Sequence, residues 1–203
     1  MREIVPTHSA LLELRGEREG MQEGYRFLDE KRLVLAAEIV QTLQCYEVSR
    51  HRFDRLFEQA SQALKSAVMR HGLEGLQVYP VAEPWTGKLS VTRRSVLGVV
   101  VQEARGEIDA ASTPPGDYAS READLCRDAF AALLPVVTEL AALSGNLHRL
   151  REDYRHTARR ARALEDVLIP EIDDTLAGLE MALEDLDREE AVRVRHQQRK
   201  RTF

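Results

Sequence analysis

The chain has 203 residues, with 29 Lys and Arg residues against 34 Asp and Glu residues, and its formal net charge is −5. This weak acidity excludes a generally basic nucleic-acid-binding protein, and the uncharged runs are shorter than the ~20 apolar residues of a membrane helix. Aromatic residues make up 5% of the chain, too few for a compact globule of this length, whereas 31% charged residues are typical of long helices. The two cysteines, Cys45 and Cys126, cannot form a disulfide framework, so we expect both to be reduced in the cytosol.

Residues 8–70 carry one long amphipathic pattern. Alternating steps of 3 and 4 residues from Leu11 reach 17 positions, of which 13 are apolar. A sustained period of 3.5 residues is typical of a coiled-coil seam that faces a partner helix. The seam positions are Leu11, Leu14, Arg18, Met21, Tyr25, Leu28, Arg32, Leu35, Ile39, Thr42, Tyr46, Ser49, Phe53, Leu56, Ala60, Ala63 and Ala67.

This first segment also has start and stop signals. Thr7 follows Pro6 directly before the pattern and is a suitable N-cap residue. Gly72 follows the last seam position and predicts the end of the helix. No proline lies between these two signals, so we predict one helix over residues 8–70, about 95 Å long at about 1.5 Å per residue.

Residues 72–117 hold most of the glycines and prolines of the chain. Short β-branched runs at 76–79, 88–92 and 95–101 are predicted to be strands because turn residues bound them. The last two runs, with Arg93 and Arg94 between them, are predicted to form a β-hairpin. Since an isolated hairpin is marginal in water, we expect it to pack on a helix or on a partner.

The last segment carries a second seam. Its period of 3.5 residues holds as far as Leu168, after which two successive steps of 4 form a stutter. Pro170 lies at the stutter and removes one helix hydrogen bond, so we predict a helix kink there. The seam positions are Leu125, Ala129, Ala132, Val136, Leu140, Leu143, Leu147, Leu150, Tyr154, Thr157, Ala161, Leu164, Leu168, Ile172, Leu176, Leu179, Leu183 and Leu186.

These patterns predict a mainly α fold. Neither long helix is stable alone in water, because each apolar stripe needs the other. We therefore predict a long antiparallel two-helix coiled coil with a small mid-chain module that contains a β-hairpin. The predicted divisions are an N-terminal helix over 1–71, the module over 72–117 and a C-terminal helix over 118–203.

Charge lies in blocks along the second helix. Residues 149–162 hold six arginines and two acids, and residues 165–190 hold eleven acids and one arginine. From residue 191 onward there are five basic residues and no acid. A single charge is explained by a solvated helix face, but blocks of this length indicate a helix that meets charged surroundings at defined heights.

Three glycines recur every fourth residue in the first helix and lie off its seam: Gly16, Gly20 and Gly24. Each costs about 1 kcal/mol relative to alanine in a helix interior. They are either tolerated surface glycines or positions where the backbone of another chain approaches closely.

No residue pattern supports catalysis. The sequence has no glycine-rich phosphate loop, no Cys/His metal spacing and no Glu-x-x-His pair, and its six histidines are scattered. We therefore expect no active site, no cofactor, no metal ion and no small-molecule ligand.

Two stretches of the sequence resemble motifs of one protein family. The N-terminal stretch is Pro6-Thr7, Leu11-Leu12, Gly24-Tyr25-Arg26-Phe27-Leu28 and Lys31-Arg32 followed by Leu35. The C-terminal stretch is Thr157-Ala158-Arg159-Arg160-Ala161-Arg162-Ala163-Leu164-Glu165 with Ile169-Pro170, continuing through Asp187-Arg188-Glu189-Glu190 and Arg193. Together they resemble the D subunit, the central rotor shaft, of V/A-type rotary ATPases, although Arg162 stands where the family signature has asparagine.

This resemblance implies a non-catalytic central-stalk protein that transmits torque between a catalytic hexamer and the membrane ion-translocating ring. The two long helices would enter the hexamer of catalytic (A) and non-catalytic (B) subunits. The mid-chain module would hold the small F subunit of the stalk and seat on the funnel-shaped C subunit. The chain would be cytoplasmic, peripheral on the cytoplasmic face of the membrane through the complex, with no direct membrane insertion.

The resemblance and the charge blocks together give candidate contact residues. The candidates for the hexamer are Gly16, Gly20, Gly24, Lys31, Arg32, Arg159, Arg160, Arg162 and Glu165. The candidates for the small F subunit are Val91, Val96, Leu97, Gly98 and Val99.

Two other functions are compatible with parts of the sequence. A coiled-coil scaffold protein explains the heptads, but not the hairpin module or the paired terminal motifs. A nucleic-acid-binding hairpin could use the basic blocks, but the net charge is negative and Phe203 is the only aromatic residue in the basic tail.

Overall fold

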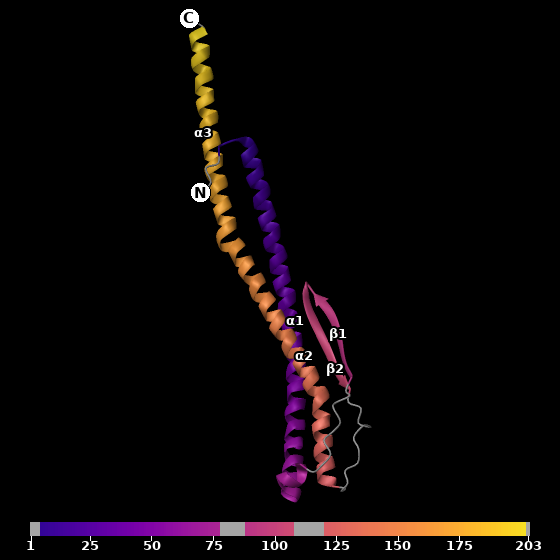
Figure 1. Cartoon of the computed structure of the whole chain (residues 1–203). Helices are drawn as coiled ribbons and strands as arrows, with labels where there is room; N and C mark the ends of the chain where they lie inside the picture. The colour runs from indigo at the N-terminus through magenta and orange to yellow at the C-terminus, as the bar shows by residue number, and fades with distance from the viewer. Residues whose placement is uncertain (1–4, 78–87, 108–119, 202–203) are drawn as a thin grey trace. The chain divides into compact units, whose positions relative to one another are not determined.

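The computed structural model of the protein describes residues 5–77, 88–107 and 120–201. Its elements in chain order are helix α1 (His8–Gln77), strands β1 (Lys88–Val96) and β2 (Val99–Glu107), helix α2 (Arg121–Ala163), the π-helical turn η2 (Leu164–Leu168) and helix α3 (Ile169–Arg201) (Figure 1). The predicted mainly α fold with a mid-chain β-hairpin is confirmed.

Two compact units divide the chain. Unit 1 comprises Met1–Leu33 and Tyr154–Phe203, and unit 2 comprises Val34–Asp153. Each unit pairs a stretch of α1 with a stretch of the second half of the chain, and unit 2 also holds the hairpin. The predicted divisions at residues 71 and 117 follow the elements in chain order, whereas these units cut across the long helices.

The N-terminal end and the seam of α1 match the predictions. Thr7 caps the helix, because the backbone N–H of Ala10 donates to Thr7 Oγ1 over 3.2 Å. All 17 predicted seam positions are buried or half-buried. The buried residues of α1 are Leu35, Thr42, Ser49, Ala60 and Ala67.

Gly72 interrupts α1 with φ 69° and ψ 168°, a backbone conformation that favours glycine. The predicted break is present, but helical residues continue beyond it to Gln77. The strand predicted at 76–79 is therefore wrong for Leu76 and Gln77, since the surroundings of a short apolar run outweigh its β propensity. Val78 and Tyr79 lie outside the described residues.

His71, directly before the break in α1 at Gly72, contacts Ser120, directly before the start of α2. Ser120 Oγ accepts a hydrogen bond from the backbone N–H of Ala123 over 3.3 Å and so caps α2. The same oxygen lies 2.6 Å from His71 Nε2. The second helix was expected from residue 118; residues 118 and 119 lie outside the described residues, and α2 begins at Arg121.

The hairpin pairs β1 and β2 in antiparallel register, from Lys88 opposite Glu107 to Val96 opposite Val99. Its two-residue turn is Leu97-Gly98, with φ values of 47° and 92°. Arg93 and Arg94, predicted to separate the strands, lie inside β1. The turn forms at Gly98 because the tight turns that match strand twist need positive φ, which glycine adopts freely.

The second seam is confirmed over most of its length. Its buried positions are Val136, Leu150, Thr157, Ala161, Ile172, Leu176, Leu179 and Leu183. Near the start of α2 the prediction is wrong: Leu125 is 53% exposed and Ala132 is exposed, while Ala123 and Leu133 are buried. Adjacent helix positions are about 100° apart, and here α2 turns a neighbouring set of apolar residues inward.

The stutter predicted in the second helix coincides with a π-helical turn. The backbone N–H of Ile169 bonds to the carbonyl of Leu164, five residues earlier. Pro170, which has no N–H, follows directly. Leu168 is 40% exposed, so it leaves the seam within this turn. The kink at Pro170 itself stays a prediction.

Within each unit, polar contacts between the helices show that they run antiparallel. In unit 1, the partner residue number falls as the α1 number rises: Arg15 with Glu180, Arg18 with Asp173 and Tyr25 with Glu165. In unit 2, Ser49 contacts Glu139 and Arg70 contacts Glu122. These contacts fix the pairing register, which the apolar pattern alone left open.

Candidate partner-binding surfaces

Polar contacts across the helix pair of unit 1 join α1 to α3 and η2. Arg15 Nη2 lies 2.7 Å from Glu180 Oε1, and Arg18 Nε lies 2.5 Å from Asp173 Oδ1. Tyr25 forms a hydrogen bond with Glu165, and this bond is the main cause that raises the pKa of the phenol. Part of the acidic block at 165–190 therefore holds the two helices together.

Three of the predicted contact arginines project outward from α2. Arg159, Arg160 and Arg162 are exposed, whereas Ala161 between them is buried at 1%. None of the three guanidinium groups forms an ion pair with a residue that the structure describes. The unused charges give this part of α2 a positive outward surface, which we call the arginine surface (Arg159, Arg160 and Arg162).

Other predicted contact residues are engaged within the chain. Arg32 Nη2 lies 2.5 Å from Asp29 Oδ1, one turn earlier on α1. Glu165 accepts the hydrogen bond from Tyr25, and Lys31 is half-buried and has an interaction of its own. These three residues are brought toward the seam, unlike the arginine surface.

None of the three regularly spaced glycines is packed tightly against the rest of the described chain. A Cβ added at Gly16 or Gly20 would meet no atom within 4 Å, and one at Gly24 would meet only Leu164 Cδ1 at 3.9 Å. Packing within the described chain therefore does not require glycine at these positions. Contact with another chain at this stripe stays a prediction.

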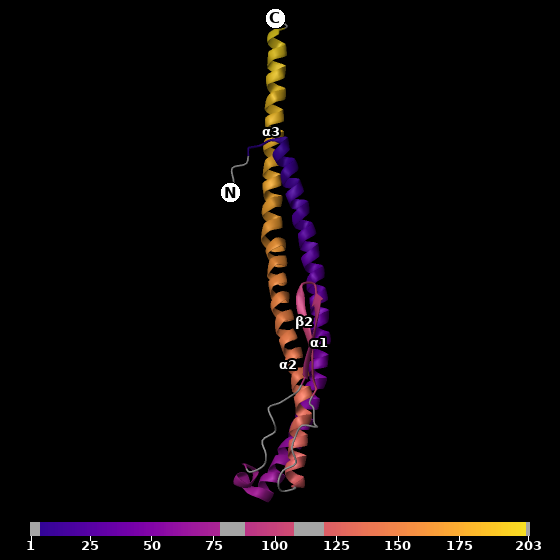
Figure 2. The same ribbon diagram turned by 45° about the vertical axis from the view of Figure 1, so that its right-hand side comes forward.

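Helix α3 continues past the N-terminal end of α1 in unit 1 (Figures 1 and 2). All side chains described from Glu184 to Gln198 are exposed, including Leu186 at 47%, which the sequence placed on the seam. Arg188 bonds with Glu184 and Asp185 over 3.1 and 3.0 Å on the same helix. This stretch thus carries its own intrahelical ion pairs, which favour helix without a partner.

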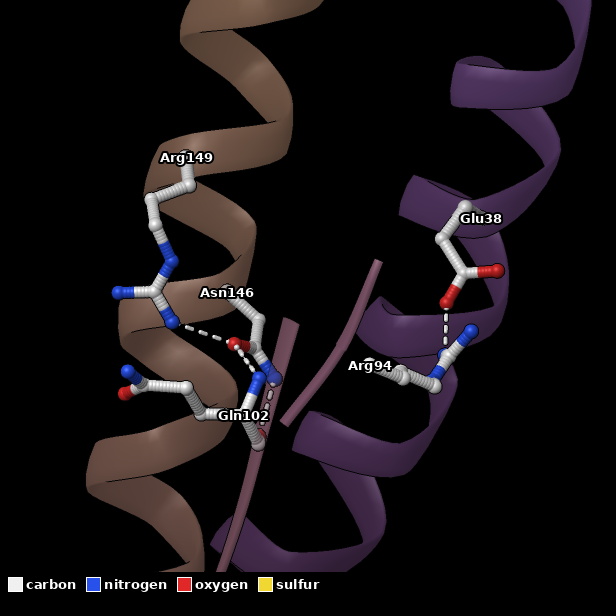
Figure 3. A network of polar contacts seen from close by, with 5 residues as sticks. All are labelled: Glu38, Arg94, Gln102, Asn146 and Arg149. Atoms are coloured by element: carbon white, nitrogen blue, oxygen red, sulfur yellow. Dashed lines mark hydrogen bonds and ion pairs between the residues drawn. The ribbon is translucent and has the colours of Figure 1, made fainter. Parts of the chain in front are cut away.

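The outer edge of β2 lies against α2 and is held by a buried asparagine (Figure 3). Asn146, 2% exposed, accepts a hydrogen bond from the backbone N–H of Gln102 over 2.8 Å and donates one to the Gln102 carbonyl over 2.7 Å. Arg149 donates to Asn146 Oδ1 over 2.6 Å and to the Val100 carbonyl over 2.9 Å. Sequence reasoning missed this group, although Ser144-Gly145-Asn146, three weak helix formers in a helix interior, marks the place.

Two further contacts hold the hairpin in unit 2. A Cβ at Gly106 would lie 2.9 Å from Thr138 Oγ1, so only glycine allows β2 to approach α2 this closely. On the other strand, Arg94 of β1 forms an ion pair with Glu38 of α1 (Figure 3). The hairpin therefore contacts both helices, as expected for a two-stranded element that is marginal alone.

The structure divides the residues predicted to bind the small F subunit. Val99 is 7% exposed, and we withdraw it from the candidate surface because its side chain packs inside unit 2, as does that of Val101 at 3%. Val91 and Leu97 are 43% and 45% exposed. Val96 is half-buried and Gly98 lies in the exposed turn. We call the exposed apolar residues Leu89, Val91, Leu97 and Val100 the open face of the hairpin.

Helix α2 also has an apolar stripe outside the seam. Phe130, Leu134 and Val137 are 40%, 38% and 42% exposed, and their spacing of 4 and 3 places them on one helix face. Within Arg121–Gln198, one stretch is long and apolar enough to cross a membrane by length and composition alone. A helix that is apolar both at its seam and on a second face has the composition of a membrane-spanning helix. In α2 that second face is the apolar stripe, which a partner protein can cover.

Among the described residues, no group of three or more His, Cys, Asp or Glu side chains is placed to hold a metal ion. The surfaces that remain are the arginine surface, the exposed end of α3 from Glu184 to Gln198, the apolar stripe of α2 and the open face of the hairpin. The charged surfaces belong to unit 1 and the apolar surfaces to unit 2, and both kinds of surface suit binding to other proteins.

Comparison with known proteins agrees with the resemblance found in the sequence. The family model of the ATP synthase D subunit matches residues 10–199. The D subunit of the V-type ATP synthase of Thermotoga neapolitana is 28% identical over 193 residues, which cover 95% of each chain. That of Anaeromyxobacter dehalogenans is 31% identical over 200 residues, and the D subunit of the A-type ATP synthase of Methanoregula boonei is 27% identical over 199 residues, each covering 96% of this chain and 95% of the relative. The matches take in both long helices and the hairpin, and the chain belongs to the family of ATP synthase D subunits.

Proposed function

We propose that the chain is the non-catalytic central-stalk rotor of a V/A-type ATPase and transmits torque between the catalytic hexamer and the membrane ion-translocating ring. Family membership makes it a component of an ATP synthase complex, a membrane-associated assembly. The observation that carries the rotor role is the arginine surface: three exposed guanidinium groups without described ion-pair partners, on a helix whose opposite side is locked into the seam.

A rotor must resist sliding of one helix along the other. The seam supplies apolar contact along both units, and the pairs Arg15–Glu180 and Arg18–Asp173 add polar contacts that match only one register. Each exposed pair contributes little energy, about 0.5 kcal/mol. Its value for a rotor lies in geometry, because a shifted register would leave these charges unmatched.

In this proposal the arginine surface and the end of α3 meet the hexamer of A and B subunits. An asymmetric shaft favours a different conformation at each catalytic interface only through its differential affinity for them. Exposed charges suit this task, because they bind specific partner groups without the large apolar patch that would hold the shaft at one angle. The contacts of Gly16, Gly20, Gly24, Lys31 and Arg32 with the hexamer belong to the same proposal.

The hairpin and the apolar stripe of α2 would bind the small F subunit and seat on the funnel-shaped C subunit. Leu97 supports this assignment, because a leucine at φ 47° is strained and yet 45% exposed. An apolar side chain kept in such a position has no packing role in the described chain that explains it. The complex would place the chain on the cytoplasmic face of the membrane as a peripheral component.

The charge-reversal pair Arg159→Glu and Arg160→Glu tests the hexamer contact. We expect the amount of hexamer recovered with the tagged chain to fall about tenfold or more, because the reversed charges would repel the groups that the arginines attract. The matched control is Arg52→Glu with Arg55→Glu, which reverses two exposed arginines of α1 in unit 2. Equal recovery and equal ATP hydrolysis with both pairs would refute the assignment of the arginine surface. Recovery of the wild-type chain without any other ATPase component would refute the rotor role.

A further inference from the structure

Asn146 is the only asparagine among the 203 residues, and it lies in the interior of a long helix. Asparagine and the preceding Gly145 both disfavour helix relative to alanine. Asn146 is also 2% exposed, so its amide has left water and requires partners. A residue that is unfavourable in two ways at one position indicates a specific role for its side chain.

The side-chain amide of Asn146 forms its hydrogen bonds with the backbone of β2 rather than with a side chain of that strand. In an antiparallel pair, residues alternately point their backbone N–H and C=O toward the neighbouring strand and away from it. Gln102 points both groups away from β1, and Asn146 satisfies both, over 2.8 and 2.7 Å. Shifting β2 by one residue along α2 would present Val101 or Glu103, whose groups face β1 instead. The contact therefore excludes a shift by one residue. A shift by two would remove Gly106 from its place beside Thr138, where a Cβ would lie 2.9 Å from Thr138 Oγ1, so the two contacts together favour one register.

Arg149 fixes the orientation of this amide. A guanidinium only donates hydrogen bonds, so its contact with Asn146 Oδ1 leaves Nδ2 to face the Gln102 carbonyl. Arg149 also donates to the Val100 carbonyl, the next outward-pointing group of β2. Asn146 and Arg149, neighbours on one face of α2, thus hold one edge of one strand together.

We propose that Asn146 is the positioning residue that fixes the hairpin on α2 in a single register, so that the hairpin turns with the shaft as one body. Through this contact Asn146 sets the direction in which the open face of the hairpin is presented to the small F subunit. This last step rests on the proposed function. The anchoring itself does not, and it can be measured on the isolated chain.

Amide hydrogen exchange of the full-length chain tests the anchoring. We expect the Gln102 N–H to exchange about 10-fold faster or more in Asn146→Ala, because both anchoring hydrogen bonds are lost. In Asn146→Asp the exchange rate of this N–H should lie between those of wild type and Asn146→Ala. A carboxylate accepts a hydrogen bond from the Gln102 N–H but cannot donate one to the Gln102 carbonyl. The amides of Val101 and Glu103 should also exchange faster in Asn146→Ala, because a hairpin released from α2 has only marginal stability.

Ser49→Ala is the matched control, because Ser49 is 5% exposed, lies in unit 2 and bonds with Glu139 rather than with the hairpin. An equal acceleration at Gln102 in Ser49→Ala, or none in Asn146→Ala, would overturn the proposal. The second readout is the affinity of the tagged chain for the purified F subunit, which should fall about 10-fold in Asn146→Ala and stay unchanged in Ser49→Ala. If Asn146→Ala speeds exchange but binds this partner as tightly as wild type, Asn146 does not orient the open face. If the wild-type chain does not bind it, the proposed partner is wrong, while the exchange result still decides the anchoring.

Discussion

Tyr25 of α1 forms a hydrogen bond with Glu165 in the π-helical turn η2, and both residues belong to the terminal motifs by which the sequence resembles its family. Tyr25 lies on the predicted seam, whereas Glu165 was assigned to contact with the hexamer. Their bond gives Glu165 a role within the chain: it ties the irregular turn of the second helix to the first helix. The N-terminal and C-terminal motifs therefore contact each other within the chain, through Tyr25 and Glu165.

This bond predicts a specific dependence of stability on pH. The neighbouring carboxylate raises the pKa of Tyr25, so the folded chain holds the phenol proton more tightly than the unfolded chain. The bond's contribution to the free energy of unfolding is complete below the ordinary tyrosine pKa of about 10 and is lost as pH rises through the raised pKa. Denaturant unfolding of wild type and Tyr25→Phe over a pH series should show their difference disappear in that window. In Glu165→Gln, tyrosinate absorbance should show this pKa returning toward its ordinary value, and an unchanged titration would contradict the assignment.

The ion pair between Arg18 and Asp173 predicts a small, salt-dependent coupling. Their atoms are 2.5 Å apart and both side chains are 42% exposed, so a double-mutant cycle with Arg18→Ala and Asp173→Ala should give a coupling free energy of about 0.5 kcal/mol. Chemical denaturation at low and high salt measures it, and the coupling should decrease as salt screens the charges. The exchanged pair Arg18→Asp with Asp173→Arg should recover most of the coupling. A coupling that is insensitive to salt would mean that packing, rather than charge, joins the two residues.

The period of the apolar residues was sufficient to predict α1 and its seam, because burial against one partner helix imposes one period on the sequence. The prediction even held at Thr42 and Ser49, which are polar and buried. It failed at the start of α2, where Leu125 and Leu133 belong to two alternative sets of apolar positions. The facing helix selects between such sets, and a single-sequence pattern does not contain that contact.

The hairpin shows a second limit of sequence reasoning. A hairpin was predicted in this stretch, but the predicted second strand, 95–101, includes Leu97 and Gly98, which form the turn, and the predicted break at Arg93-Arg94 lies inside β1. A run of β-branched residues does not show where the chain turns, whereas the positive φ that Gly98 adopts does. Asn146 was missed because periodicity treats an off-pattern polar residue as surface. Ser144-Gly145-Asn146 conflicts with helix propensity, and that conflict marks a polar anchor to another element.

Leu97 gives a prediction with two opposite effects. Its φ of 47° is unfavourable for leucine and tolerated by asparagine. Leu97→Asn should therefore stabilise the hairpin by up to about 1 kcal/mol, slowing exchange of the ladder amides by up to about fivefold. The same change should weaken binding of the small F subunit, because it removes an exposed apolar side chain. Leu97→Ala separates the two effects, since it removes the side chain but keeps the strain. If Leu97→Asn binds this partner as tightly as wild type, the turn is not part of the contact.

Gly106 and Thr138 form a steric pair that a compensating substitution can test. In Gly106→Ala the new Cβ would lie 2.9 Å from Thr138 Oγ1, an oxygen held in place by its hydrogen bond to the Leu134 carbonyl over 2.8 Å. We expect β2 to shift away from α2, the Asn146 hydrogen bonds to lengthen and the Gln102 amide to exchange several-fold faster.

Thr138→Ala removes the obstructing oxygen and leaves the Thr138 Cβ at 3.5 Å, an ordinary van der Waals distance. The double variant should therefore recover wild-type exchange, or become slightly slower, because alanine reduces the conformational entropy of the unfolded chain. Thr138→Ala alone should change exchange little, since its hydroxyl donates only to the carbonyl one turn back. Fast exchange that persists in the double variant would place the clash elsewhere, and normal exchange in Gly106→Ala alone would show that β2 does not approach α2 this closely. If exchange is fast in Gly106→Ala and returns to the wild-type rate in the double variant, the close approach of β2 to α2 at this point depends on the absence of a Cβ at Gly106.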